Sequence, residues 1–201
     1  GGSQTDSVGK TVSIPSLRIN HNITFERNTF AYSDATPDSS FYSNFFDSEI
    51  TYDSLHSDNL KNEFAVILPA DQQRRSAFFR NWSLSAALEH QTTKYEQKNK
   101  YSWDNLAASG KIISKYDSSD FNATVSSKYV LSGHDNGNFQ TDVEVHTKQY
   151  FFGSFGGKIS IGQYSPDFYL LEYLSNNFIW EKEFSKIKSN SIQFNYNLIK
   201  Y

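Results

Sequence analysis

Apolar and polar residues alternate with a period of two along much of this chain. The alternation is strict between Asn138 and Lys148. One set of positions there holds Phe139, Thr141, Val143, Val145 and Thr147, and the other holds Gln140, Asp142, Glu144, His146 and Lys148. Successive side chains of a β-strand point to opposite faces of the sheet, so this segment is predicted to be a strand with one apolar and one wet face.

The same alternation recurs in other windows and predicts roughly nine strands. They are centred near residues 20, 64, 85, 107, 126, 143, 160, 180 and 195. Many are about ten residues long, which is the length that a tilted strand needs to cross a bilayer. The longest apolar run, Phe64–Ala70, is far shorter than the ~18 residues of a transmembrane helix, so any membrane crossing would have to use strands.

Polar connections separate the predicted strands. Gly133–Asn138 contains the Gly and Asn residues that tight turns favour, which predicts an antiparallel hairpin on either side of it. Thr92–Lys100 is expected to link two strands. Two connections are longer, Tyr32–His56 and Tyr164–Asn177, and a helical turn is expected within the second, at Phe168–Leu174.

Alternation alone does not separate a membrane barrel from a soluble sandwich, because both have one apolar face per strand. The long strands and the joining of sequential neighbours favour an up-and-down barrel. Aromatic residues near strand ends also favour it, as in the girdles of membrane barrels. These aromatic residues are Tyr101, Trp103, Tyr116, Phe121 and Tyr150–Phe152.

The predicted fold is therefore all-β: an antiparallel up-and-down meander that is part of a transmembrane outer-membrane β-barrel. Strand number, tilt and stagger are linked in a barrel, so nine or so strands from a larger one would form an open partial barrel. Its unpaired edges are expected at Leu17–Phe25 and Ile192–Leu198. The whole chain, 1–201, is expected to be a single barrel segment with a flexible N-terminal stretch at 1–12.

The composition indicates that the chain folds and does not bind nucleic acid. Aromatic residues make up 16%, with 13 Tyr and 17 Phe, although only 37% of residues are hydrophobic. Disordered chains are poor in aromatics. The net charge of −3 gives no basic excess for nucleic acid. The chain has no Cys, which excludes disulfides and thiolate metal sites. It starts at Gly1 without Met or a signal peptide, which indicates a mature or excised segment.

Three stretches of the N-terminal part resemble the putative porin family of Gram-negative Bacteroidota, a group of outer-membrane barrels. The stretches are Ile19–Glu26, the Tyr- and Asp-rich connection Phe41–Asp47 with Thr51–Ser54, and Asn62–Leu68. The resemblance is clearest from Leu17 to Leu68, and beyond it only the style of strands and turns matches. Members of that family are longer than this chain, so the resemblance implies that the chain is an internal or C-terminal piece of such a barrel.

The sequence contains no convincing catalytic or metal-binding motif. Gly9–Thr11 suggests a phosphate loop, but Gln4 stands where that loop needs a glycine. No two of the five histidines have metal-ligand spacing, and no serine lies in a G-x-S-x-G motif. Asp135–Asn138 resembles half of a calcium loop without its bidentate acid, so a hairpin turn explains it better. Gly153, Gly156 and Gly157 are expected to mark a bulge or a tight strand bend. We therefore expect neither an enzyme nor a cofactor.

The leading functional hypothesis is a passive pore in the bacterial outer membrane, in contact with lipid and with small solutes or ions. Charged side chains on the wet faces would bias which ions pass. The predicted pore-lining residues are Glu89, Lys128, Asp142, Glu144, His146 and Lys148. The alternative is a soluble or surface-exposed β-sandwich that binds a partner through aromatic-rich loops, especially Phe41–Tyr52. A third reading, part of an active transporter barrel with a plug, is disfavoured because no plug-like globular segment is visible. The oligomeric state cannot be predicted from these patterns.

Overall fold

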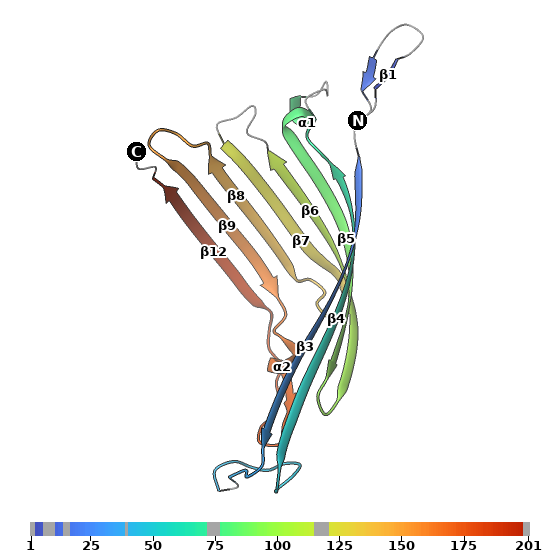
Figure 1. The fold of residues 1–201 in the computed structure, drawn as a ribbon, viewed down its shortest axis with the longest axis vertical. Coiled ribbons are helices and arrows are strands. Elements are labelled where there is room, and N and C mark those ends of the chain that lie inside the picture. The colour runs from blue at the N-terminus through green and yellow to red at the C-terminus, as the bar shows by residue number, and fades with distance from the viewer. Residues whose placement is uncertain are drawn as a thin grey trace.

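The computed structural model describes residues 3–5, 11–13, 17–38, 40–71, 77–114 and 121–198. Within them, eight long strands form one antiparallel sheet (Figure 1). The strands are β3 (Arg18–Asp34), β4 (Thr51–Leu68), β5 (Trp82–Glu96), β6 (Lys100–Ser114), β7 (Phe121–Gly133), β8 (Phe139–Thr147), β9 (Ser154–Tyr164) and β12 (Ile187–Asn197). The expected all-β class is confirmed. The flexible stretch predicted at 1–12 lies mostly outside the described residues.

The remaining elements are short. Strands β1 (Ser3–Thr5) and β2 (Thr11–Ser13) pair with each other, as do β10 (Glu172–Leu174) and β11 (Ile179–Glu181). The helices are α1 (Ala77–Asn81) and α2 (Phe168–Leu171), and the second confirms the helical turn expected there. Neither helix is long and apolar enough to cross a membrane, and the described residues contain no other helix.

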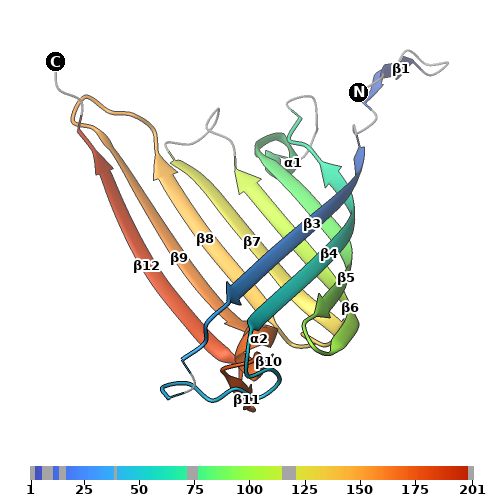
Figure 2. The ribbon, with the colours of Figure 1, turned by 60° about the horizontal axis from the view of Figure 1, so that its bottom comes forward.

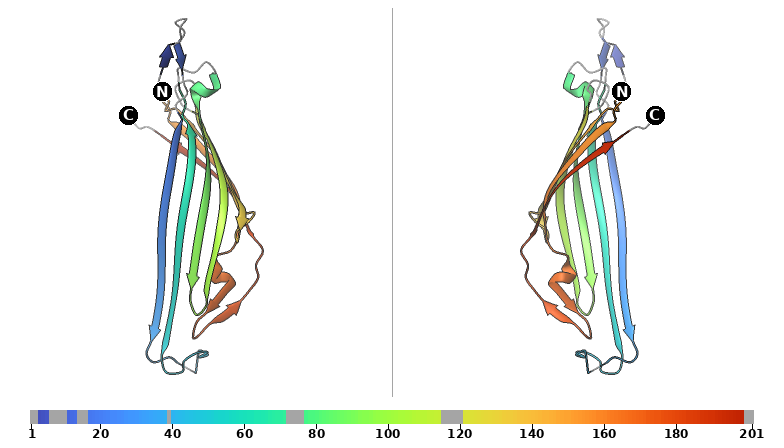
Figure 3. Two further views of the ribbon diagram at one scale, coloured as in Figure 1. Left: turned by 90° about the vertical axis from the view of Figure 1, so that its right-hand side faces the viewer. Right: turned by 90° about the vertical axis from the view of Figure 1, so that its left-hand side faces the viewer.

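The sheet is an up-and-down meander, as predicted. Its order is β12-β9-β8-β7-β6-β5-β4-β3, so each strand lies beside the next long strand of the chain. Strands β3 and β12 form the two edges and do not pair with each other, which confirms the open sheet with edges at these two segments. Figures 2 and 3 show that the sheet is curved, like part of a cylinder wall.

Three local predictions need correction. The strand expected near residue 180 is only the three-residue β11, outside the large sheet, because its chain turns back where Ser175 and Phe178 bond to each other. The connection at Tyr32–His56 is shorter than expected, since β3 continues to Asp34 and β4 begins at Thr51. Thr92–Lys100 is mostly strand, with a turn at residues 97–99 between β5 and β6.

The glycine predictions are partly right. Gly133 and Gly137 have positive φ angles of 106° and 81° in the hairpin between β7 and β8, which confirms the predicted turn. Gly153 also has a positive φ, in the bend before β9. The bulge is wrong for Gly156 and Gly157, which pair with His146 and Val145 in unbroken register.

The two faces of the sheet differ in chemistry. Paired residues of antiparallel strands share a face, so the register from β3 to β12 assigns each strand position to one of two sets. We call the first set the outer face, and its central residues are Ile23, Phe64, Leu88, Ile112, Val125, Val143, Ile159 and Phe194. The second set, the inner face, includes Asn22, Glu63, Glu89, Lys111, Ser126, Asp142, Lys158 and Gln193.

Exposure is inverted relative to a soluble protein. On the outer face Phe194 is 87% exposed and Leu88 is 54% exposed. On the inner face Ala107 is only 3% exposed and Tyr95 5%. Side chains of the inner face are thus covered by their neighbours to a greater extent than the large apolar side chains of the outer face. The described residues form no second large sheet that could cover the apolar face, as a sandwich requires.

The apolar band covers only part of the longest strands. On the outer face of β3 it ends near Phe25 and is followed by Arg27. On β5 it runs from Leu84 to Leu88 and is followed by His90, Thr92 and Lys94. The Arg27 guanidinium forms an ion pair of 2.7 Å with Asp58 on this face. Strands β3–β6 thus extend past the apolar band into a charged region, which explains why they are longer than alternation alone predicted.

Candidate functional site

The strand register brings five of the six predicted pore-lining residues onto the inner face. They are Glu89, Lys128, Asp142, Glu144 and His146. These residues come from three strands, β5, β7 and β8. The first and last of them, Glu89 and His146, are 57 positions apart in the sequence. The sixth, Lys148, follows the end of β8 and lies in the connection to β9, so no strand pairing assigns it to a face.

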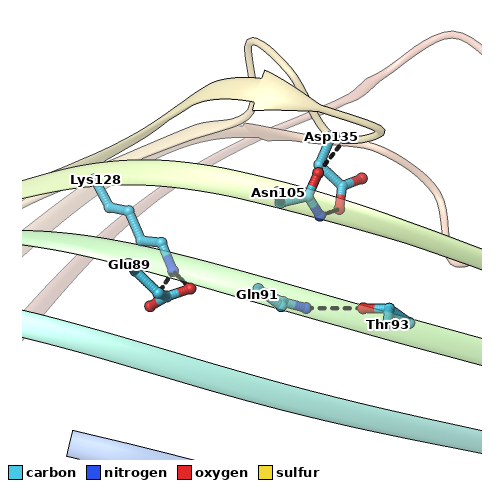
Figure 4. Close-up of polar contacts among 6 residues, drawn as sticks. All are labelled: Glu89, Gln91, Thr93, Asn105, Lys128 and Asp135. Atoms are coloured by element: carbon cyan, nitrogen blue, oxygen red, sulfur yellow. Dashed lines mark hydrogen bonds and ion pairs between the residues drawn. The ribbon is translucent and has the colours of Figure 1, made fainter.

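Glu89 and Lys128 form an ion pair across the inner face. Lys128 Nζ lies 2.8 Å from Glu89 Oε1 and donates a second hydrogen bond of 2.9 Å to Oε2 (Figure 4). The pair joins β7 to β5 over the intervening β6, where the small side chain of Ala107 lies opposite Glu89 in the register. Because Glu89 is mostly buried, this pairing offsets the cost of desolvating its charge.

Asp142 is the centre of a second polar cluster, on β8 and β9. It accepts hydrogen bonds from Ser160 Oγ and, at 3.0 Å, from Gln140 Nε2. Lys158 Nζ lies 3.6 Å from Asp142 Oδ1. These contacts fix the carboxylate and place a cation beside it, so the inner face carries charges of both signs within a few ångströms.

His146 and Glu144 lie further along the same strand, with His146 Nε2 2.7 Å from Glu144 Oε1. Gly156 explains how the histidine fits. A Cβ atom at Gly156 would lie 2.0 Å from Asn195 Oδ1 and 2.5 Å from His146 Nδ1. The glycine therefore leaves room for side chains from β8 and β12 to meet above it, which is the reason for a glycine where sequence reasoning expected a bulge.

A folded insertion, residues 165–186, connects β9 to β12, and the sequence predicted its helical turn but not its docking on the sheet. It contains α2, β10 and β11, and Figure 2 shows these elements at one end of the sheet, near the loop between β3 and β4. The insertion begins at the end of β9, near the β12 edge of the sheet, and contacts residues of β4, β5 and β6. These strands are three to five places away from β9 in the sheet order, so the insertion crosses the inner side.

Aromatic rings hold α2 against the inner face. The Phe168 ring centroid lies 4.8 Å from that of Tyr95, 4.8 Å from that of Tyr101 and 5.1 Å from that of Trp103. His134, in the hairpin between β7 and β8, lies 4.8 Å from Trp103. Tyr101 and Trp103 were predicted as girdle residues, but the register places them on the inner face, where they pack on the insertion instead of facing lipid.

Asn176 ties the insertion to the loop 35–50 and to the start of β4. Its side-chain Oδ1 accepts hydrogen bonds of 2.9 Å from the N–H groups of Phe46 and Asp47. Its Nδ2 donates to the Asp47 carbonyl at 2.8 Å and to Thr51 Oγ1 at 2.9 Å, and its backbone N–H donates to Asp53 Oδ1. Asn176 is almost fully buried, so these bonds are protected from water.

Further polar contacts anchor the insertion to the turn between β5 and β6. Tyr101 and Asn99 both donate to Glu172 Oε1, and the Leu174 N–H donates to Gln97 Oε1 at 3.0 Å. The Glu172 carboxylate favours the protonated phenol and raises the pKa of Tyr101. The insertion is therefore held both by the loop 35–50 and by the turn between β5 and β6. It occupies part of the space on the inner side of the sheet.

Burial beneath the insertion raises the pKa of Tyr95 to about 12, from an ordinary value of 10.0. Tyr95 lies beyond the apolar band of β5. Because the folded pKa is raised, the stability that protonated Tyr95 contributes to the docked insertion is fully present below pH 10 and is lost as pH rises towards 12. We expect the insertion to become protease-sensitive over that interval. Tyr95→Phe should weaken this alkaline transition and leave the contribution of Tyr101, and an unchanged transition in the variant would assign it to Tyr101 or another group.

The described residues contain no group of three or more His, Asp and Glu side chains that could hold a metal ion. The half calcium loop at Asp135 is a hairpin turn, in which the Asn105 side chain donates to Asp135 Oδ2 at 2.7 Å (Figure 4). What the inner face offers is a polar surface of mixed charge. A hollow of about 450 Å³ lies along it, lined among others by Asn22, Glu63, Lys111 and Asp142.

The comparisons with known proteins agree with this architecture. The model of one family, described as putative porin, matches residues 7–201. Neither the search of curated proteins nor that of solved structures found a match. The match covers nearly the entire chain, including the C-terminal part in which only a general strand pattern was visible from the sequence. The chain belongs to the putative porin family.

Proposed function

We propose that this chain forms part of the wall of a passive pore in the bacterial outer membrane, through which small solutes or ions pass. The outer face would contact lipid and the inner face would line the water-filled lumen. Further strands would close the cylinder at β3 and β12, since open sheet edges do not occur in the hydrocarbon region. The lining residues would be Glu89, Lys128, Asp142, Glu144, His146 and Lys148.

The observation that carries this proposal is the exposed apolar outer face. Large apolar side chains on every long strand point away from the polar side of the sheet. A soluble protein rarely exposes a continuous apolar surface of this extent, whereas lipid stabilises one. The alternative of a soluble sandwich module is disfavoured, because the sandwich would need a second sheet on this face.

Aromatic residues at one end of the sheet support an interfacial position. Tyr150 stacks on Phe152 with ring centroids 5.3 Å apart, and Phe155 on β9 stacks on Tyr196 of β12 at 4.7 Å. Such rings suit the headgroup layer, where one side is apolar and the other is wet. The charged extensions of β3–β6 lie at the other end of the sheet and would project into water beyond the membrane.

The proposed mechanism is physical and involves no catalysis. A solute would stay hydrated along the inner face, and fixed charges would favour or oppose each ion according to sign. Since Glu89 pairs with Lys128 and Asp142 lies beside Lys158, the described lining is balanced and predicts weak ion selectivity. We do not expect an enzymatic activity.

Breaking one ion pair should shift that balance in a predictable direction. In the intact protein, Lys128→Gln leaves the Glu89 carboxylate unpaired and should move the reversal potential, measured in planar bilayers under a KCl gradient, towards cation selectivity. Glu89→Gln should move it towards anion selectivity. The matched control is Lys94→Gln, on the outer face beyond the apolar band, which should leave the reversal potential unchanged. Equal shifts for all three variants would contradict the proposed lining.

A further inference from the structure

The insertion and the sheet enclose a second hollow, at the end where β3–β6 extend beyond the apolar band. Its volume is about 470 Å³, within the range of about 300–1,000 Å³ that is usual for small-molecule sites. The wall on the sheet side comes from β3, β4, β5 and β6, and the opposite wall comes from Ser165–Tyr169 and the hairpin between β7 and β8. A solute entering the inner side from this end would pass it.

The wall combines aromatic rings with neutral polar groups. Tyr95, Trp103, Phe168 and Tyr169 contribute rings, and the polar lining consists mainly of amides and hydroxyls. These polar residues are Asn28, Ser57, Asn59, Gln91, Thr93, Asn138 and Ser165. Figure 4 shows that Gln91 already donates to Thr93, at 3.2 Å, along β5. No lysine or arginine lines the described wall, and the ionisable groups there are His134, Asp135 and Asp167.

Two polar atoms of this wall are unpartnered. The Tyr95 hydroxyl and Asn59 Oδ1 are buried and have no hydrogen-bond partner in the described part of the chain. Buried polar groups without partners are uncommon in folded proteins. Ser57 pairs with Tyr95 and Asn59 with Thr93, so the two side chains are diagonal neighbours on one face. One is an acceptor, and the other is a hydroxyl that can donate or accept.

We propose that this hollow is a binding site for a neutral polyhydroxylated solute of monosaccharide size, held by its hydroxyls on Tyr95 and Asn59 and by its C–H face on the aromatic rings. The assignment rests on the proposed pore function and names the class of solute that the pore takes. A cationic amine is the competing class, because two carboxylates, Asp135 and Asp167, line the opposite wall. Asn105 already donates to Asp135, and the two unpartnered atoms are neutral, so they favour a neutral solute.

The test uses the intact protein in planar bilayers, with D-glucose as the probe. Glucose added to the conducting pore should reduce the ion current in a saturable way. Tyr95→Phe keeps the ring that packs on Phe168 and removes only the hydroxyl, and Asn59→Ala removes the acceptor. Each substitution should raise the glucose concentration that blocks half of the current by roughly two- to tenfold, which corresponds to the loss of one hydrogen bond. Tyr129→Phe, on the outer face, is the matched control and should bind glucose like the wild type.

The outcomes separate this inference from the proposed function. A protein that conducts no ions would overturn the pore itself. A conducting pore whose current glucose does not reduce, or reduces equally in wild type, Tyr95→Phe and Asn59→Ala, would overturn the site alone. Glucosamine and glucuronate report the charge class, and tighter block by either than by glucose would overturn the assignment to a neutral solute.

Discussion

Replacing Val143 by arginine is expected to prevent most of the intact protein from assembling in the membrane. Val143 lies on the outer face of β8, between Val125 of β7 and Ile159 of β9. An arginine there would face the hydrocarbon region, at a cost of about 2–4 kcal/mol near the midplane. Membrane barrels that have assembled migrate differently on gels before and after heating, so the assembled fraction can be measured directly.

The neighbouring residue gives the matched control. Glu144→Arg introduces the same side chain one position away, on the inner face beside Lys158. It should leave assembly intact, because a charge in a water-filled lumen stays hydrated, and it should shift selectivity towards anions. Failure of Glu144→Arg to assemble while Val143→Arg assembles normally would mean that the two faces are inverted.

The second large effect is expected at Asn176. Asn176→Leu keeps the branching and the number of side-chain heavy atoms but removes four side-chain hydrogen bonds of the insertion, three to the loop 35–50 and one to Thr51 of β4. The N–H groups of Phe46 and Asp47 would lose their partner, at about 1–3 kcal/mol each if they remain buried. We expect the insertion to undock, with faster hydrogen exchange in residues 165–186 and a higher single-channel conductance.

Asn177 provides the comparison for this prediction. Its Nδ2 donates to the Ser43 carbonyl at 3.2 Å and to Asn44 Oδ1 at 3.1 Å, in a more exposed position. Asn177→Ala should therefore change hydrogen exchange and conductance much less than Asn176→Leu. If the two variants behaved alike, or if Asn176→Leu left both measurements unchanged, the insertion would not be held by the buried contacts described above.

Period-two alternation predicted the sheet well because one chemical rule governs most of it. Every residue of β8 from Phe139 to His146 lies on the face that alternation assigned, and the register extends that assignment to the neighbouring strands. The rule fails in the charged extensions. Arg27 and Asp58 occupy outer-face positions there, so the apolar and polar sets no longer differ and strand ends cannot be read from the pattern.

The docking of the insertion escaped prediction for a different reason. Its docking depends on contacts between segments more than 70 residues apart, such as Glu172 with Tyr101 and Asn176 with Asp53. Sequence periodicity reports only local structure, and it cannot tell which loop an asparagine will bind. The sequence signals were Pro166 and the apolar run that forms α2. They indicated that the strand ends there, but not which part of the sheet the following segment contacts.

The central claim is that the polar face of this sheet meets water and the apolar face meets lipid. This stretch contains no cysteine, so single cysteines can be placed along β8 from position 139 to 146. A membrane-impermeant maleimide applied to the assembled protein in bilayers should label positions 140, 142, 144 and 146 and spare positions 139, 141, 143 and 145. Uniform labelling, or an alternation with the opposite phase, would contradict the account.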